Sequence, residues 1–102
     1  MSKYHAIKTE IDGRVFASRA EGRRYSELCL LEKAGEIEGL ECQPVFQIFV
    51  NKKHICNYLA DFRYKTNGAE VVEDVKGVKT PVYRLKKKLV QAIYGIEIIE
   101  VE

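Results

Sequence analysis

Two aspartates and a lysine flank a tight turn of this chain, and their types and spacing are suited to chemistry. Asp61 precedes the dipeptide Asn67-Gly68, and Asp74 and Lys76 follow it. Asn-Gly favours a two-residue loop between antiparallel strands. If Asn67 and Gly68 form that loop, the residue numbers of any two facing residues add up to 135. Asp61 then faces Asp74. Because facing Cβ atoms lie only about 4.5–5.5 Å apart and like charges there are destabilising, this pair needs a counter-charge or a proton.

The alternation of side chains along a strand decides which residues share the face of this acid pair. Residues two apart point to the same side, so Lys76 joins Asp61 and Asp74, whereas Glu73 points away. An oxygen-rich cluster suits Mg²⁺, which prefers a few carboxylates together with waters and phosphate oxygens. A bound metal would neutralise the facing charges, activate water and polarise a phosphoryl group, with Lys76 stabilising the transition state. The predicted chemistry is hydrolysis of a phosphodiester.

A third carboxylate, Glu21, is expected near this pair. Ser18 begins a Ser-x-x-Glu capping box and Gly35 is a stop signal, which together predict a helix from about Arg19 to Ala34. Glu21 lies on the same stripe of that helix as Tyr25, and therefore on its inward face. Two interpretations remain open: Glu21 belongs to the acidic site, or it only caps the helix, a role worth about 1 kcal/mol.

The other acidic and basic residues also have a plainer interpretation. Asp61 and Asp74 could be exposed residues that pair with Arg63 and Lys76 on a solvated face, and Lys76 could protect the edge of a sheet from aggregation. A helix that follows the turn needs a sheet face to cover, which favours burial of this face and hence the site.

The remaining pattern predicts an α/β fold with a mixed sheet flanked by helices. A short hairpin around Asp12-Gly13 comes first, and then the order α-β-β-β-α-β. After the first helix, we expect strands at 45–50, 55–65 and 70–76, a helix at 81–94 and a strand at 96–101. The second helix begins with Thr80 as N-cap and ends before Gly95. The expected core stripe of that helix is formed by apolar residues at helical spacing: Val82, Leu85, Leu89, Ala92 and Ile93.

Composition limits the classes of protein that this chain can belong to. Its 102 residues, 46% of them hydrophobic, fit a single domain over 1–102. No apolar run approaches the roughly 20 residues that cross a bilayer, so we expect a cytoplasmic protein without a membrane partner and without an organic cofactor. Its three cysteines lack metal-ligand spacing, and a net charge of +2 is too small to identify a nucleic-acid binder by itself.

Longer stretches carry a resemblance to known nucleases. They are "FASRAEGRRYSELCLLEKAGEIEGLECQPVF", "YLADFRY" and "VVEDVKGVKT". Asp61, a hairpin and then Asp74-Val75-Lys76, preceded by a helix that carries Glu21, resembles the motif of the PD-(D/E)XK nuclease superfamily. The longer stretches look like a small phage-associated endonuclease family formerly of unknown function, similar in layout to Holliday-junction resolvases. Ala60 stands where a proline commonly precedes the first acid.

The resemblance implies specific roles and a restriction-endonuclease-like core over about residues 18 to 101. Asp61, Asp74 and the backbone carbonyl of Val75 would hold Mg²⁺, with Mn²⁺ as a substitute. Glu21 would assist the metal, and Lys76 would be the catalytic lysine. The resemblance also implies a phage- or prophage-associated protein.

A basic stretch follows the motif and is a candidate nucleic-acid contact. We expect phosphate-backbone contacts from Lys79, Arg84, Lys86 and Lys87. A lysine run on a helix is more often only its solvated face, and both interpretations remain open.

Two functions of different classes follow from the sequence. The leading hypothesis is a Mg²⁺-dependent endonuclease that hydrolyses DNA, with branched DNA such as a Holliday junction as one candidate substrate. The alternative is a nucleic-acid-binding subunit that keeps the nuclease fold but cuts only within a larger assembly or not at all. So small a chain would hold a long duplex better as a homodimer, so a second copy is an expected partner.

Overall fold

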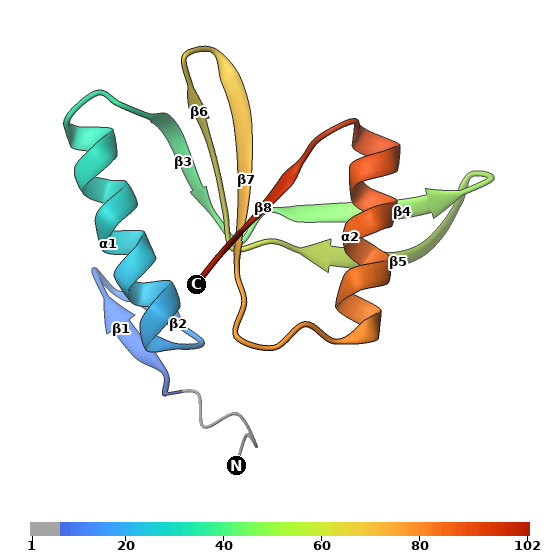
Figure 1. Ribbon diagram of the computed structural model, residues 1–102, viewed down its shortest axis with the longest axis horizontal. Helices are drawn as coiled ribbons and strands as arrows, with labels where there is room; N and C mark the ends of the chain where they lie inside the picture. The colour runs from blue at the N-terminus through green and yellow to red at the C-terminus, as the bar shows by residue number, and fades with distance from the viewer. Residues whose placement is uncertain (1–6) are drawn as a thin grey trace.

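A mixed four-stranded sheet forms the centre of the computed structural model, which describes residues 7–102 (Figure 1). The elements are β1 (Thr9–Ile11), β2 (Arg14–Phe16), α1 (Arg19–Lys33), β3 (Glu38–Cys42), β4 (Val45–Val50), β5 (Lys53–Leu59), β6 (Phe62–Thr66), β7 (Ala69–Val75), α2 (Pro81–Tyr94) and β8 (Ile98–Val101). The central sheet has the order β3-β6-β7-β8, and β1-β2 and β4-β5 form separate hairpins. Among the described residues, the β7–β8 pair alone is parallel.

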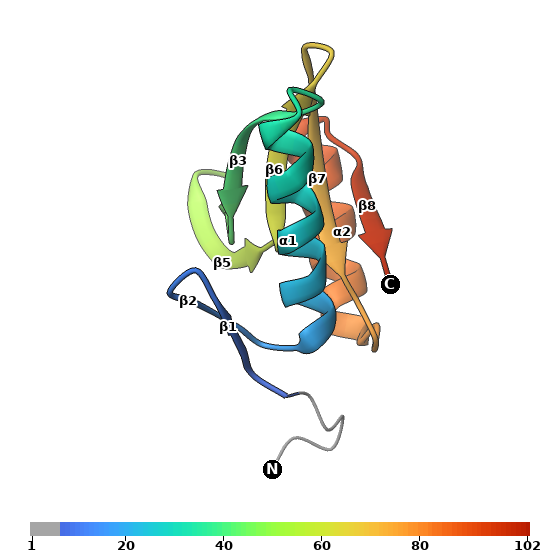
Figure 2. The same ribbon diagram turned by 90° about the vertical axis from the view of Figure 1, so that its left-hand side faces the viewer.

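Helix α1 covers one face of the central sheet (Figure 2). Its buried residues, Tyr25 and Leu28, pack with Phe62 and Tyr64 of β6 and with Phe16 of β2. The β1–β2 hairpin reaches α1 closely enough that a Cβ built on Gly22 would lie 3.0 Å from the side chain of Ile11. A side chain at position 22 would therefore require the side chains of Ile11 and Thr9 to shift slightly.

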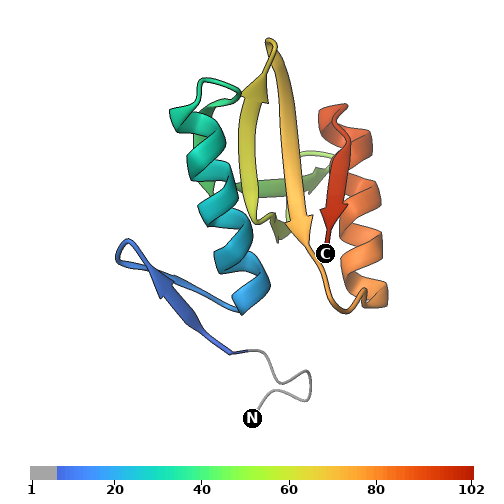
Figure 3. The ribbon, with the colours of Figure 1, turned by 60° about the vertical axis from the view of Figure 1, so that its left-hand side comes forward.

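Helix α2 and the β4–β5 hairpin cover the opposite face, so that the sheet lies between the two helices (Figure 3). Tyr83 and Val90 of α2 pack with Val72 of β7 and Ile98 of β8. The hairpin adds a further group of apolar side chains to this second core: Phe46, Ile48, Tyr58 and, just after the hairpin, Ala60.

The expected α/β fold is confirmed, as are both helices and the turn that sets the central register. Asn67 and Gly68 both have positive φ, 52° and 78°, as a two-residue hairpin loop requires. The β6–β7 register then runs from Thr66↔Ala69 to Phe62↔Glu73. Ser18 and Thr80 cap α1 and α2 through their side chains.

A strand that the sequence did not predict, β3, forms one edge of the sheet. Its five residues include Gly39, with φ of 67°, and two glutamates, a composition that is depleted in strands. Pairing with β6 stabilises it, although the register shifts between Glu38 and Glu41. The backbone N–H of Leu40 also donates a hydrogen bond to the Glu32 carboxylate of α1 at 2.9 Å.

The expected single strand at 55–65 is divided into β5 and β6 by a break at Ala60 and Asp61. There, the Ala60 N–H donates to the Pro44 carbonyl, and the Gln43 N–H donates to the Asp61 carbonyl. These bonds fix the corner at which the chain leaves the hairpin and enters the central sheet. Because of this corner, Tyr58 and Ala60 pack on the α2 side of the sheet.

The expected core stripe of α2 is wrong, because the helix is rotated about its axis. Within the predicted stripe, Val82, Leu85, Ala92 and Ile93 are exposed, and only Leu89 is half-buried. The buried residues of the helix are Tyr83 and Val90 instead, and two tyrosine hydroxyls bond to the elements that α2 packs against. The Tyr83 hydroxyl donates to Glu100 of β8 at 2.6 Å, and the Tyr94 hydroxyl donates to the backbone carbonyl of Gln47 at 2.8 Å.

A buried ion pair joins α1 to β7. Glu73 is 2% exposed and accepts two hydrogen bonds from Arg24, at 2.8 and 2.7 Å, and a third from the Tyr64 hydroxyl. As expected from strand alternation, Glu73 thus points away from its neighbour Asp74 and toward α1. Burial and the Glu73 carboxylate raise the pKa of Tyr64 to about 12, so Tyr64 remains a donor at neutral pH.

Replacing Arg24 with alanine should cost about 3 kcal/mol of the free energy of unfolding, because Glu73 would keep a buried charge without its bidentate partner. Chemical denaturation at pH 7 measures the loss. Arg23→Ala is the matched control, since the neighbouring Arg23 is exposed and its replacement should change stability by less than about 0.5 kcal/mol. Equal effects of the two replacements would contradict a role for the buried pair.

Candidate active site

Asp61 is held at the end of β7 by a hydrogen bond to the backbone. Its Oδ2 accepts from the Val75 N–H at 2.7 Å, and its own N–H donates to the Glu73 carbonyl at 3.1 Å. Asp61 lies in the bend before β6, one residue outside the ladder, which ends at Phe62↔Glu73. The expected direct facing of Asp61 and Asp74 is therefore wrong, because the corner at Ala60 interrupts the strand.

Asp74 is a fully buried carboxylate with no hydrogen bond. Its exposed fraction is 0%, and neither Oδ1 nor Oδ2 has a hydrogen-bond partner. Lys76 Nζ lies 3.5 Å from Oδ1, and the residue beside Asp74 in the β7–β8 register is a second acid, Glu100. Burial raises the pKa of Asp74 to about 6 against the opposing effect of Lys76, and Glu100 adds to the increase.

Glu21 approaches the same strand end from α1. Its backbone N–H donates to the Ser18 hydroxyl, and that hydroxyl donates to the Glu21 carboxylate at 3.4 Å, so the capping role is present. The carboxylate also lies against Asp61: burial first, and then the Asp61 charge, raise the pKa of Glu21 to about 7. Glu21 thus caps α1 and belongs to the acidic group at the same time.

The four predicted side chains gather around the end of β7. Asp61 and Glu21 come together beside Val75, and Asp74 and Lys76 lie next to each other near Tyr83. The two pairs also act on each other, since the charge of Lys76 acts on Glu21 as well as on Asp74, and the charge of Asp61 acts on Tyr83. The four residues therefore form one group, to which both helices contribute neighbours.

Tyr83 and Glu100 complete the surroundings of Lys76, and the sequence analysis did not place them at the site. Lys76 Nζ lies 4.7 Å from the centroid of the Tyr83 ring, a distance at which the ring face attracts a cation. Glu100 accepts the Tyr83 hydroxyl and forms ion pairs with Lys79 and Lys87 at 3.1 and 3.3 Å. The Tyr83 bond, followed by these lysines, lowers the pKa of Glu100 to about 2.

A cavity of about 450 Å³ opens beside Glu21 and Val75. Figure 3 shows that the N-terminal ends of both helices and the end of β7 lie at the same end of the molecule. The residues that line the cavity come from the start of α1, the end of β7 and the loop before α2: Ala17, Ser18, Ala20, Glu21, Val75, Gly77, Val78 and Thr80. A substrate can therefore approach Glu21 and the end of β7 from solvent.

The donors at the end of β7 fit a hard divalent cation in their chemistry. Asp74 has two buried oxygens without partners, an arrangement that native structures rarely leave uncompensated, and Glu21 and Asp61 are two adjacent carboxylates. Carboxylate oxygens are the ligands that Mg²⁺ prefers. Among residues 7–102, however, no three acidic, histidine or cysteine side chains already form a ligand group, so binding requires side-chain rotation.

A basic groove of about 510 Å³ lies between α2 and β8. It is lined by Lys79, Arg84, Lys87, Lys88, Gln91 and Glu100. Four cations against one carboxylate leave this groove strongly positive. Of the predicted nucleic-acid contacts, Lys79, Arg84 and Lys87 line it, whereas Lys86 is half-buried elsewhere on α2 and Lys88 takes its place.

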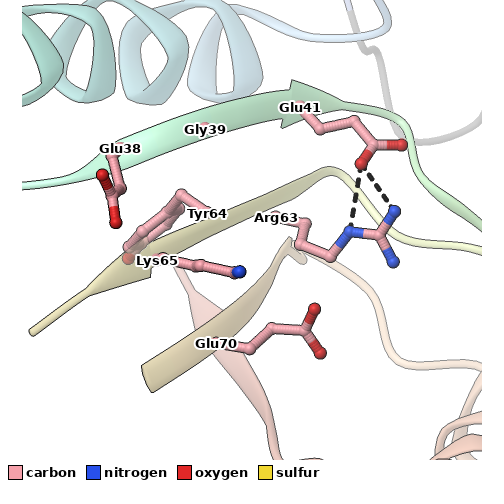
Figure 4. A pocket seen from close by; sticks show the side chains of 7 residues that line it. All are labelled: Glu38, Gly39, Glu41, Arg63, Tyr64, Lys65 and Glu70. Atoms are coloured by element: carbon pink, nitrogen blue, oxygen red, sulfur yellow. Dashed lines mark hydrogen bonds and ion pairs between the residues drawn. The ribbon is translucent and has the colours of Figure 1, made fainter. Parts of the chain in front are cut away.

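A further hollow, of about 540 Å³, crosses β3, β6 and β7 (Figure 4). Arg63 points at Glu41 in this hollow and forms an ion pair with it at 2.5 Å. Lys65 is flanked in register by Glu38 and Glu70. Three glutamates against two basic residues give this hollow an acidic balance, which is unsuited to a phosphate backbone. Arg63 thus pairs with Glu41, and the sequence interpretation that paired it with the two aspartates is wrong.

Stability without metal should fall as the pH rises from 5 to 8. Folded Asp74 and Glu21 titrate near pH 6 and 7 rather than near 3.8 and 4.5, so in this range the folded state binds more protons than the unfolded state. The melting temperature in a chelator measures this, and Mg²⁺ at pH 8 should recover part of the loss. Glu100 titrates too low to contribute.

Asp61→Asn is the control for this pH effect. It should lower the pKa of Glu21 by removing a neighbouring charge, reduce the decline with pH and abolish the recovery by Mg²⁺. A wild-type melting temperature that stays constant or rises between pH 5 and 8 would contradict the buried, uncompensated carboxylates.

Comparison with known proteins identifies a family but no function. Within residues 7–102, no helix is long and apolar enough to cross a membrane. No curated protein and no solved structure matches the chain. A family model described as "Protein of unknown function (DUF1064)" matches residues 1–98, and the chain therefore belongs to the DUF1064 family.

Proposed function

We propose that this protein is a metal-dependent endonuclease that hydrolyses phosphodiester bonds of DNA, built as a single PD-(D/E)XK-like nuclease domain. The observation that carries the proposal is the buried Asp74, whose carboxylate has no hydrogen bond and lies beside Lys76 at an accessible strand end. A purely structural acid in a core is expected to have partners, as Glu73 has. Asp74 is instead available to a cation.

The proposed metal ligands are Asp61, Asp74 and the backbone carbonyl of Val75, with Glu21 beside them. When bound, Mg²⁺ or Mn²⁺ would activate water and polarise the scissile phosphate. Glu21 lines the cavity and supplies negative charge there, Asp61 lies against Glu21, and the Val75 N–H fixes the orientation of Asp61.

Lys76 is the proposed catalytic lysine. Its ammonium group is held between Asp74 and the ring of Tyr83, and it donates hydrogen bonds to the phosphate oxygen on which negative charge increases in the transition state. Since Lys76 also acts on Glu21, one cation serves both halves of the site.

The basic groove between α2 and β8 is the proposed contact for the flanking DNA backbone. Tyr83 connects it to the site, because Lys76 lies over the Tyr83 ring and the Tyr83 hydroxyl binds Glu100 in the groove. Phosphates bound by Lys79, Arg84, Lys87 and Lys88 would extend away from the scissile bond. Lys86 is proposed as a more distant contact. Branched DNA is a proposed substrate because the longer sequence stretches look like a small phage-associated endonuclease family that is similar in layout to Holliday-junction resolvases.

A second candidate function is a nucleic-acid-binding subunit that depends on a larger assembly for cleavage. The observation that favours it is that the described residues hold no ready-made group of three metal ligands. Binding of DNA by the groove without cleavage of any substrate would support this alternative.

Purified protein with Mg²⁺ should cleave at least one of linear, circular and four-way-junction DNA. Asp74→Ala and Lys76→Ala should each reduce the cleavage rate by about 100-fold or more, because each removes charge stabilisation at the phosphate. The rate of product formation on gels measures this. Glu70→Ala is the control, as Glu70 is an exposed acid on the same strand. Cleavage that survives Asp74→Ala would refute the proposed site.

Lys87→Ala should weaken the binding of duplex DNA by the same factor for every sequence, because a phosphate contact is lost. In a plot of log affinity against log salt concentration, the magnitude of the slope should decrease by about 1. Fluorescence anisotropy in a chelator measures binding apart from cleavage. Lys65→Ala, in the acidic hollow of Figure 4, should leave the affinity unchanged. Equal losses for the two variants would exclude the groove as the contact.

A further inference from the structure

The outer face of the β4–β5 hairpin is apolar and exposed. One face of the hairpin packs on α2 through Phe46, Ile48 and Tyr58. The alternating residues point outward, and Figure 1 shows the hairpin reaching past α2. Four large apolar residues are about half exposed or more: Val45 54%, Phe49 45%, Ile55 59% and Leu59 54%. Exposed apolar residues gathered on one face mark an interaction surface more often than scattered ones do.

The order of side chains along this face is nearly the same from either end. Val45 faces Leu59 at the base of the hairpin, and Gln47 faces Asn57 in the middle. Near the tip, Phe49 faces His54, and the register shift leaves Ile55 as the additional residue on β5. The pattern is therefore apolar at the base, amide in the middle and apolar with one histidine near the tip, with steps of two residues, or about 6.8 Å, along β4.

Such a pattern is complementary to itself. A two-fold axis through the amide pair would place the base of one hairpin on the tip of the other, so that apolar groups meet apolar groups. The Gln47 amide carries both donors and an acceptor, so that it can pair with its own copy, whereas Asn57, whose Oδ1 lies 2.6 Å from His54 Nε2, offers its amide N–H groups as donors. No lysine, arginine or carboxylate points outward between Val45 and Phe49 or between Ile55 and Leu59, and a second copy meets no like charge there.

A second exposed apolar stripe, on α2, lacks this property. On α2, Val82, Leu85 and Ile93 are exposed, but Lys86 and Lys88 flank the stripe. Two copies packed along α2 would bring lysines together, and like charges at close range are unfavourable. Charge therefore selects the hairpin, rather than α2, as the surface for a second copy.

We propose that the outer face of the β4–β5 hairpin is a homodimer interface, with its two-fold axis beside Gln47 and Asn57. Because the patch is smaller than the roughly 20–30 residues that each partner contributes to a standard interface, the dimer should dissociate in the micromolar range. This proposal is independent of the nuclease proposal, since self-association is measured without DNA or metal.

Sedimentation equilibrium from 1 µM to 1 mM, about the range over which a weak dimer forms, tests the proposal. Wild type should change from monomer to dimer, and Val45→Asp and Ile55→Asp should remain monomeric with circular dichroism like that of wild type. Leu85→Asp is the matched control, because Leu85 is as exposed as Ile55, at 59%, and this variant should still dimerise. A monomeric wild type at every concentration, or dimers of Val45→Asp, would overturn the proposal.

A second measurement does not depend on disruptive variants. Gln47→Cys should form an intermolecular disulfide on mild oxidation, since residue 47 lies next to its own copy at the axis. Wild type, whose Cys29, Cys42 and Cys56 are half-buried, and Leu85→Cys supply the background. Cross-linking of Leu85→Cys with none for Gln47→Cys would overturn the proposed surface.

Discussion

The burial of two adjacent carboxylates on β7 is the constraint on which the rest of the structure depends. Glu73 and Asp74 are both almost inaccessible to water, and strand alternation sends them to opposite faces. On the α1 side, Arg24 and Tyr64 satisfy Glu73. On the α2 side, Asp74 receives only an ion pair at 3.5 Å. The Glu73 carboxylate therefore stabilises the packing of α1 on the sheet, whereas the Asp74 carboxylate remains available for a ligand.

The corner before β6 and the first turns of α1 and α2 determine which side chains lie near Asp74. The corner at Ala60 takes Asp61 out of the β6–β7 ladder and lets its side chain bind the Val75 N–H. Helix α1 begins beside this point and brings Glu21 with it. Helix α2 begins after the loop that follows Lys76, so Tyr83 lies over the lysine. The site thus joins both layers of the molecule, and movement of either helix would change its geometry.

Local signals predicted much of this structure, and long-range contacts account for the rest. Asn67-Gly68 set the β6–β7 register, and the caps at Ser18 and Thr80 placed both helices, because these effects act over a few residues. The corner at Asp61 depends on hydrogen bonds from Gln43 and to Pro44, which no local pattern contains. In the observed orientation of α2, the Tyr83 hydroxyl donates to Glu100 of β8, a contact that the helix sequence alone does not contain. Consequently, local patterns predicted that Glu21, Asp61, Asp74 and Lys76 lie together, whereas the contributions of Tyr83 and Glu100 were missed.

We propose that the end of β7 binds a divalent cation through Asp74. Broadening of backbone amide signals by Mn²⁺ in nuclear magnetic resonance spectra tests it most directly, because paramagnetic broadening reports distance from the metal. We predict that Val75 and Lys76 broaden first and saturate in wild type, and that Asp74→Asn removes this effect. Broadening centred elsewhere, such as on Glu38 and Glu70, or equal broadening in Asp74→Asn, would contradict the account.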